Sequence, residues 1–226
     1  MYIVKVGVFE MTVVYIVRHC ESMANLSHSF AGNADVDISP KGAKQLECLK
    51  ERFKNIKLDR VYSSHLIRAY KTAEAINVGS GCEIEIDDSF IEMNLGIYDG
   101  KPVTCMTAEE TYRWNNQPHD FEVPMGETMD EVCHRVFEGI KRVAKDNPDS
   151  TVAIASHGCA VRALIRQLRK LPREELKNVD WCDNTGVNKV IFYDDGNFNL
   201  EIENDSSHLS EDAKAESIAN WNWTEE

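Results

Sequence analysis

In the stretch Val13-Val14-Tyr15-Ile16-Val17-Arg18-His19, a short apolar run stops abruptly at an arginine and a histidine. A continuous apolar run of this length is typical of a buried strand in a parallel sheet. The carboxyl edge of such a sheet is where α/β proteins bind their ligands. Arg18 and His19, with the small polar residues Ser22 and Asn25 that follow, suit an oxyanion such as phosphate. An ordinary strand end with a surface Arg–His pair gives the same local pattern.

A second apolar run ends in the same way. Residues 151–156 are followed directly by His157 and Gly158, and the apolar residues after them recur at helical spacing. A helix that begins after His157 contributes its partial positive charge and free N–H groups to the strand end. A third strand-like run, residues 60–63, leads into a helix that carries Arg68 near its first turn. If these strands are neighbours, the two histidines and Arg68 share one pocket.

The rest of the chain alternates strand-like and helix-like segments. The clearest helix spans residues 127–145, and Ser39-Pro40 marks the start of another. This alternation predicts one α/β domain, a three-layer α/β/α sandwich with a mostly parallel sheet. Residues 194–197 form a turn that pairs the last two strands as a hairpin and gives the sheet an antiparallel edge strand. The strands are expected at residues 12–18, 59–63, 151–156, 187–193 and 198–203.

Length and composition agree with a single enzyme domain. A chain of 226 residues with 42% hydrophobic content can bury a substantial core. We expect one catalytic domain over residues 1–209 and an acidic C-terminal tail over residues 210–226. Residues 1–11 are a candidate extra N-terminal segment: they add an edge strand to the sheet, or they precede an alternative start at Met11.

Cysteine content and charge limit the compartment and the partners. The seven cysteines include no Cys-x-x-Cys pair, which argues against a disulfide framework and against a zinc module. With no signal peptide or membrane span in the sequence, they predict a cytoplasmic protein. The net charge of −13 disfavours nucleic acid and anionic membranes as partners. Trp221 and Trp223 either cover the protein's own body or contact a partner chain, as they would in a homodimer.

Five motifs in the same order resemble those of the histidine phosphatase superfamily, which includes the cofactor-dependent phosphoglycerate mutases. The first family motif is Arg-His-Gly-Glu-Ser/Thr-x-x-Asn, and this chain has Cys20 in place of the glycine. The motifs spread over residues 13–203, and an Asn-Asp-x-Ser-His-Leu stretch extends the resemblance to Leu209. The matching segments are Arg18–Asn25, Ser64–Ala73, Glu92–Gly100, Pro124–Thr128 and Ser156–Gly158.

The resemblance implies a role for each site residue. A neutral His19 attacks phosphorus and forms a phosphohistidine, which divides one difficult displacement into two easier ones. Arg18 and Arg68 bind the phosphate oxygens, and His157, protonated while phosphate is bound, donates to it as well. Glu92 protonates the leaving group and then takes a proton from water. The other residues assigned to phosphate or substrate binding are Asn25, Ser22, Gly158 and Glu21.

Cys20 is the one departure from the family's motifs. A cysteine phosphatase needs an arginine six residues after its cysteine, and Leu26 stands there, so a thiol mechanism is disfavoured. If the family's glycine has a left-handed backbone, Cys20 strains the loop and lowers activity; if the position only has to be small, cysteine fits. A thiol beside a histidine and two arginines could also have a lowered pKa, which predicts reversible inhibition by peroxide.

Within the superfamily, the same machinery supports a mutase or a phosphatase. The resemblance implies a longer insertion in mutases than the short segment 101–123 found here. We therefore expect a metal-independent phosphomonoesterase of the histidine acid phosphatase type, without a cofactor, whose partner is a small phosphorylated metabolite. A phosphoglycerate mutase-type isomerase and a low-activity phosphate-binding regulatory protein remain alternatives. The residues of this segment that either line the substrate pocket or pack as a surface helix are Thr104, Tyr112, Arg113, Trp114, Asn116 and His119.

Overall fold

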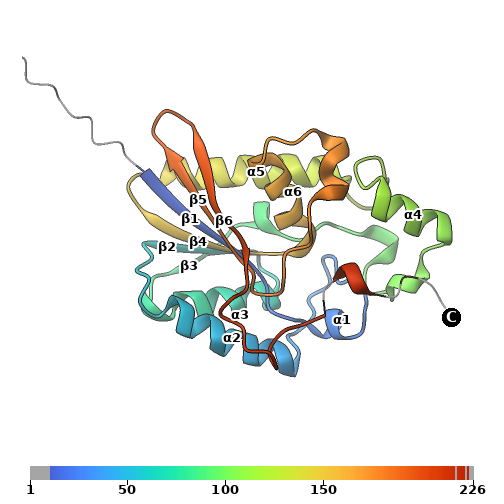
Figure 1. Ribbon diagram of the computed structural model, residues 1–226, viewed down its shortest axis with the longest axis horizontal. Helices are drawn as coiled ribbons and strands as arrows, with labels where there is room; N and C mark the ends of the chain where they lie inside the picture. Colours follow the sequence, from blue (N-terminus) through green and yellow to red (C-terminus); the bar gives the residue numbers. More distant parts are fainter. Residues whose placement is uncertain (1–10, 217, 222, 224–226) are drawn as a thin grey trace, which may run out of the picture.

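The computed structural model describes residues 11–216, 218–221 and 223 of the chain (Figure 1). Four strands of its six-stranded sheet pair in parallel, and the last two form an antiparallel hairpin. The first strand of this hairpin also pairs antiparallel with its neighbour in the parallel part. In spatial order the strands are β3 (Ile84–Ile86), β2 (Arg60–Ser63), β4 (Thr151–Ser156), β1 (Met11–Arg18), β5 (Val187–Tyr193) and β6 (Phe198–Asp205).

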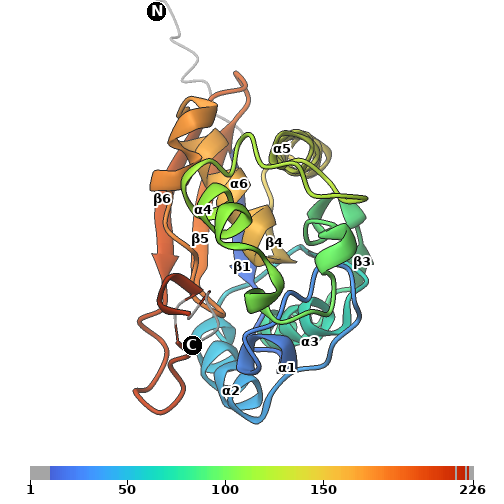
Figure 2. The same ribbon diagram turned by 90° about the vertical axis from the view of Figure 1, so that its right-hand side faces the viewer.

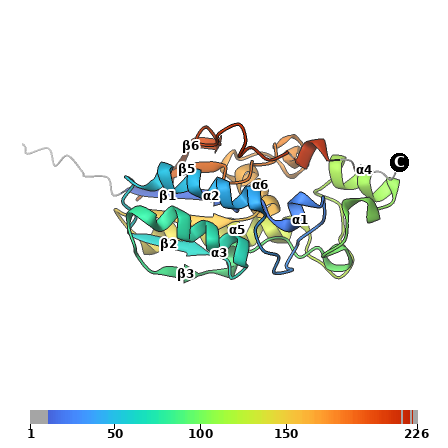
Figure 3. The same cartoon turned by 90° about the horizontal axis from the view of Figure 1, so that it is seen from below.

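Helices cover both faces of the sheet, as Figures 1 and 3 show. One face carries α2 (Pro40–Phe53) and α3 (Ile67–Ile76), and the other carries α5 (Met129–Asp146) and α6 (Gly158–Leu168). The short α1 (Met23–Leu26) and α4 (Ala108–Asn116) lie beyond the carboxyl ends of the parallel strands (Figure 1). No helix in the described part of the chain is long and apolar enough to span a membrane. The 3₁₀ helices are η1 (Asn77–Gly79), η2 (Asp88–Phe90), η3 (Gly96–Tyr98), η4 (Val103–Cys105), η5 (Arg173–Asn178) and η6 (Ile218–Asn220).

The sheet separates two apolar cores, and the side chains on each of its faces contribute to one of them. Val14 and Ile16 of β1 belong to the larger core, which includes the apolar stripes of α5 and α6. Val17 of β1 belongs to the smaller core, which includes residues of α2 and α3. Because successive residues of a strand point to opposite faces, a strand covered on both sides must be apolar throughout, as the run in β1 is. The predicted three-layer sandwich is confirmed.

The five predicted strands are present within two residues of their expected bounds. The predicted helix at residues 127–145 is α5, and Thr128 sets its start through a capping box with Glu131. The strand that the sequence did not predict is β3. It has three residues at the edge of the sheet, none of them buried, so it leaves no apolar run to detect.

The described residues after β6 pack against the rest of the domain. Ala213 is fully buried, and its carbonyl accepts a hydrogen bond of 2.9 Å from Gln45 Nε2 in α2. The ring of Trp221 stacks on His28, with 5.0 Å between centroids. Figure 2, which looks onto this end of the molecule, shows α1, α4 and the last described residues grouped there. The extra strand or alternative start expected at the N-terminus concerns residues 1–10, which lie outside the described residues.

Candidate active site

Three parallel strand ends meet at one edge of the sheet. Arg18 and His19 lie at the end of β1, His157 directly follows β4, and Ser64 and Arg68 follow β2. Since β2, β4 and β1 are neighbours in that order, the groups at their ends share one pocket. The imidazole rings of His19 and His157 are 5.1 Å apart between centroids, and all five residues are buried. The structure brings the predicted histidines and arginines together.

His19 is held in one tautomer. Its Nδ1 lies 2.6 Å from the carbonyl oxygen of Cys20, and because a carbonyl only accepts, Nδ1 carries the proton. The other ring nitrogen, Nε2, therefore keeps a free lone pair. Burial and the positive charges of Arg68 and Arg18 hold the pKa of His19 well below its usual range. Near neutral pH, His19 is a neutral imidazole with an available lone pair, which is the form a nucleophile needs.

Three buried donors in this pocket have no partner. They are Arg18 Nε, Arg68 Nε and His157 Nδ1, none of which makes a hydrogen bond within the described part of the chain. Backbone carbonyl oxygens hold terminal nitrogens of both guanidinium groups at 2.5 to 2.8 Å, which fixes the direction of each side chain. An unsatisfied buried polar group costs about 1–3 kcal/mol, so such groups are rare in proteins. Three of them together, two of them cationic, match the acceptor oxygens of an oxyanion.

Ser64 makes His157 a donor toward such an anion. Its hydroxyl oxygen lies 2.7 Å from Nε2 of His157. When the hydroxyl donates to Nε2, the proton of the neutral ring resides on Nδ1, which is the nitrogen without a partner. When the ring is protonated, the hydroxyl accepts from Nε2 and Nδ1 still donates. Burial, Arg68 and His19 hold the pKa of His157 well below its usual range, and the negative charge of a bound phosphate would act in the opposite direction.

These buried histidines predict acid-sensitive stability. The folded-state pKa values of His19 and His157 lie below the unfolded value near 6.5, and that of His208 is lowered to about 4, chiefly by burial. The unfolded chain therefore binds protons first as the pH falls below about 6.5, and stability is lost from there downward, by up to about 1.4 kcal/mol per pH unit for each histidine. Urea unfolding at pH 7.5 and pH 5.5 measures this loss. His157→Gln should show a smaller loss than the wild type, and an equal loss in both would contradict the assignment.

The carboxyl group of Glu92, from the loop after η2, lies at the amino end of α6. Its Oε1 accepts hydrogen bonds from the backbone N–H groups of Met93 at 2.9 Å, Cys159 at 3.1 Å and Ala160 at 3.3 Å. Arg135 of α5 holds the loop that carries Glu92, because its Nη2 donates to the backbone carbonyl of Glu92 at 3.0 Å. The carboxyl group lines the same cavity as His19. A carboxyl group held there can exchange a proton with a leaving group or with water.

Gly158 has no side chain, and this leaves space in the cavity. A Cβ atom at this position would lie 3.5 Å from Glu92 Oε2, 3.6 Å from Arg18 Nε and 3.6 Å from the ring of Trp181. The glycine therefore faces the space between the carboxyl group and the unpartnered donor. A side chain there would occupy the volume that the predicted site needs for its ligand.

Of the other predicted binding residues, Asn25 lines the cavity, whereas Ser22 and Glu21 do not. Asn25 lines it, with its Oδ1 accepting from Ser22 at 3.1 Å and from Asn184 Nδ2 at 3.3 Å, which leaves its amide N–H groups for a ligand. Ser22 is fully buried as the N-cap of α1. Glu21 accepts a hydrogen bond of 2.5 Å from Ser39 at the start of α2. Ser22 and Glu21 hold the loop that follows His19 and do not touch the cavity.

Two residues of the site had no role assigned from the sequence. Ser64 belongs to a matched motif and directly follows β2, so its place at a strand end could have indicated its contact with His157. Asn184 Nδ2 donates to the carbonyl oxygen of His19 at 3.0 Å. Asn184 lies in a loop before β5, where no pattern marks it.

Cys20 is a packing residue. Its backbone is not among the positive-φ residues of the described chain, so the loop carries no left-handed strain there. The side chain is fully buried in the smaller core with Leu46 and Leu49 of α2. Burial raises the pKa of the Cys20 thiol to about 12. Of the two alternatives for this position, the structure supports the second: a small side chain is accommodated without strain. The expectation of a thiol with a lowered pKa is wrong, because the side chain points into the core and not toward the arginines.

Replacing Cys20 with alanine should leave the rate nearly unchanged. The substitution removes one buried sulfur atom, so we expect kcat within about twofold of the wild type and a loss of about 1 kcal/mol in unfolding free energy. Cys20→Gly should likewise not raise the rate. Peroxide treatment should inhibit wild type and Cys20→Ala equally, since the neutral thiol is protected. A tenfold faster Cys20→Gly enzyme would contradict the absence of strain.

Aromatic side chains surround the cavity above His19. Of the six residues singled out in segment 101–123, only Trp114 lines it, while Tyr112 on the same helix is 59% exposed. Tyr112, Arg113, Trp114 and Asn116 belong to the helix α4, from which Trp114 is turned to the pocket, whereas Thr104 lies in η4 and His119 follows α4. Trp221 and Trp223 line the cavity as well. Both tryptophans pack against the protein's own body, as the first of the two interpretations expects.

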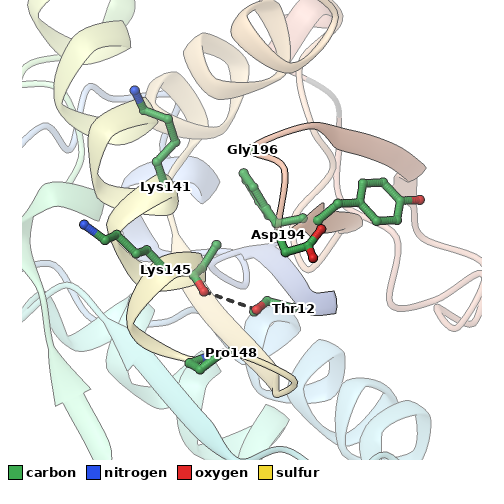
Figure 4. A pocket seen from close by; sticks show the side chains of 9 residues that line it. Thr12, Lys141, Lys145, Pro148, Asp194 and Gly196 are labelled. Atoms are coloured by element: carbon green, nitrogen blue, oxygen red, sulfur yellow. Dashed lines mark hydrogen bonds between the residues drawn. The ribbon is translucent and has the colours of Figure 1, made fainter. Parts of the chain in front are cut away.

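A second, larger cavity lies at the amino end of the sheet (Figure 4). It is bounded by Lys141 and Lys145 of α5 and by Asp194 and Gly196 in the β5–β6 turn. Thr12 at its base is committed to the backbone, because its hydroxyl donates to a carbonyl at the end of α5 at 3.1 Å. Among the described residues, no histidine, cysteine or serine lines this cavity.

Within the described residues, no group of three or more His, Cys, Asp or Glu side chains could hold a metal ion.

Comparison with known proteins agrees with this geometry. Residues 14–205 match the family model of the histidine phosphatase superfamily (branch 1). The sequence is 30% identical over 204 residues to phosphoserine phosphatase 1 of Hydrogenobacter thermophilus, covering 89% of this chain and 96% of that protein. The structure is similar to YhfR of Bacillus stearothermophilus, with a TM-score of 0.82, 26% identity, and coverage of 87% of this chain and 98% of that one. A phosphoglycerate mutase from Bacillus anthracis str. Sterne shares the fold, with a TM-score of 0.76, 22% identity, and coverage of 88% and 96%.

Proposed function

Because the chain belongs to the histidine phosphatase superfamily (branch 1), we propose that it is a metal-independent phosphomonoesterase that forms a phosphohistidine on His19. Its substrate is a small phosphorylated metabolite, a proposal supported by the phosphoserine phosphatase among its relatives. The term histidine acid phosphatase, expected from the sequence, names a different family and does not apply. The observation that carries the proposal is the set of three buried unpartnered donors beside a neutral histidine.

In the first step, the phosphate group binds to Arg18 Nε, Arg68 Nε and His157 Nδ1. The lone pair of His19 Nε2 attacks phosphorus while the bond to the leaving oxygen breaks, and Glu92 gives that oxygen a proton. The two guanidinium groups stabilise the charge on the phosphoryl oxygens, which is the main task of a protein in phosphoryl transfer. Because Nδ1 of His19 donates to the Cys20 carbonyl, the positive charge that develops on the ring is stabilised by an existing hydrogen bond.

In the second step, water attacks the phosphohistidine. Glu92, now a carboxylate, takes a proton from the water, the bond between phosphorus and Nε2 breaks, and inorganic phosphate leaves. His19 regains its lone pair and the site returns to its starting protonation. The charge that a metal ion would supply comes from Arg18 and Arg68.

The experiment is phosphate release from p-nitrophenyl phosphate with EDTA present. We expect full activity in EDTA and no stimulation by magnesium or zinc. Activity that EDTA abolishes and a divalent ion restores would overturn the metal-independent mechanism. 3-Phosphoglycerate supplied with its bisphosphate primer tests the mutase alternative in the same assay, because a mutase returns the phosphoryl group to the sugar acid and releases little phosphate. The regulatory alternative rested on damage by Cys20, which the packing of that residue does not support.

A further inference from the structure

We propose that the substrate of this site is the phosphate ester of an alcohol with an uncharged apolar or aromatic group. That group rests against an aromatic wall beside His19, made by Phe30, Trp114, Trp181, Trp221 and Trp223. The inference rests on the proposed phosphatase function, because it concerns the part of the ester that is left when phosphate is removed.

The aromatic wall is assembled from four separate parts of the chain. Phe30 follows α1, Trp114 belongs to α4, Trp181 lies between η5 and β5, and Trp221 and Trp223 lie near the end of the chain. Phe30 lies at the centre, with its ring 5.8 Å from that of Trp114 and 5.9 Å from that of Trp223. The chain has four tryptophans, and all four line this one cavity. Large apolar surfaces gathered at a catalytic group are typical of a binding site for an apolar ligand.

Trp181 is fixed by a buried arginine. The guanidinium carbon of Arg162 lies 4.5 Å from the centroid of the Trp181 indole, a cation–π contact. Arg162 also donates to the carbonyl oxygens of Val179 at 2.8 Å and Leu176 at 3.1 Å. Its charge is therefore committed to the loop and to the indole, and is not available to a substrate.

The described part of the chain leaves no cation in the cavity for a substrate carboxylate. Among the described residues that line it, Arg18 and Glu92 are the only Lys, Arg, Asp or Glu side chains, and both already have roles in phosphate binding and proton transfer. Two nearby basic side chains are paired with acids of the last segment: Lys214 with Glu211 at 2.6 Å, and His28, which follows α1, with Glu216 at 3.2 Å. An amino-acid or glycerate group would lose its hydration against the aromatic wall without gaining an ionic partner.

The donors left in the described residues of the cavity are neutral: the side-chain amide of Asn25 and the indole of Trp114. Trp114 is 3% exposed, and its indole N–H has no hydrogen-bond partner within the described residues. The Asn25 amide is placed to donate to an ether or hydroxyl oxygen of the substrate. The wall therefore favours an apolar group with at most neutral polar atoms, unlike the phosphoserine in the name of the relative from Hydrogenobacter thermophilus.

The test compares benzyl phosphate with phosphoserine, both esters of primary alcohols. We expect kcat/KM for benzyl phosphate to be at least about tenfold higher in the wild type. Trp223→Ala should lower kcat/KM for benzyl phosphate by about ten- to hundredfold and change that for ethyl phosphate, which lacks the ring, less than about threefold. Tyr112→Ala, which removes an exposed aromatic side chain of the same region, is the matched control and should behave as wild type.

The binding of ligands that cannot be hydrolysed tests this inference independently of the proposed phosphatase function. Since every tryptophan lines the cavity, indole fluorescence reports ligand binding there directly. Benzylphosphonate should bind to the wild type at least about tenfold more tightly than the phosphonate analogue of phosphoserine. Equal or weaker binding of benzylphosphonate, or a kcat/KM for phosphoserine equal to or above that for benzyl phosphate, would overturn the inference. If no ester is hydrolysed while benzylphosphonate still binds preferentially, the proposed phosphatase function fails and the wall's preference stands.

Discussion

Replacement of His19 by alanine is expected to lower kcat by about four orders of magnitude or more, because the variant lacks the nitrogen that receives the phosphoryl group. The fold should survive, since the imidazole makes one hydrogen bond, to the carbonyl of the next residue. Arg18 and Arg68 keep their contacts with backbone carbonyls, so the variant should still bind substrate. Phosphate release measures kcat, and tryptophan fluorescence measures binding in the same samples.

His65→Ala is the matched control for this variant. His65 follows Ser64 at the same sheet edge, but its side chain is exposed and contacts Asp88 at 2.8 Å. It should retain wild-type activity. A His19→Ala enzyme with more than about one hundredth of the wild-type rate would show that another group accepts the phosphoryl group.

Glu92→Gln is expected to lower turnover of benzyl phosphate by about 10²- to 10⁴-fold, the usual contribution of general acid–base catalysis. The amide keeps the shape of the side chain and an oxygen that can accept from Met93, Cys159 and Ala160. It cannot protonate the leaving alkoxide. With 2,4-dinitrophenyl phosphate, whose leaving group needs no proton, the first step should remain fast while the attack of water stays slow.

The variant should therefore release a rapid burst of dinitrophenolate, equal to one equivalent per site, followed by slow turnover. Stopped-flow absorbance measures both phases. Glu122→Gln, which changes an exposed carboxylate in the loop after α4, is the control and should turn over as wild type. Equal loss of the first step with both esters would contradict the assignment of Glu92 as the acid.

The meeting of the catalytic groups could be predicted from the sequence because each stands where an apolar run ends. Runs that end in Arg18-His19 and in His157 require strands with both faces covered, and such strands place their carboxyl ends along one edge. Motif order then implied that Arg68 and Glu92 belong to the same site. The orientation of each group could not be predicted. The tautomer of His19 depends on one backbone carbonyl, and the direction of His157 depends on Ser64.

What the sequence did not reveal depends on contacts between distant parts of the chain. The aromatic wall joins Phe30 to Trp223, and no periodic pattern links positions so far apart. Whether Cys20 strains its loop depends on a backbone angle that a motif does not record. Ser22 and Glu21 match motif positions, yet their side chains cap α1 and contact Ser39 of the next helix start, so a motif match alone does not separate contact with substrate from support of the loop.

The proposed mechanism requires a covalent bond between phosphorus and His19 Nε2. Glu92→Gln mixed with 2,4-dinitrophenyl phosphate should accumulate that intermediate, because water attack lacks its base. We would quench the reaction in alkali, which preserves phosphohistidine, digest the protein and locate the added phosphoryl group by mass spectrometry. The predicted result is one phosphoryl group on His19, absent when His19→Ala is combined with Glu92→Gln. A phosphoryl group on any other residue, or a burst of dinitrophenolate with no phosphorylated peptide, would contradict the claim.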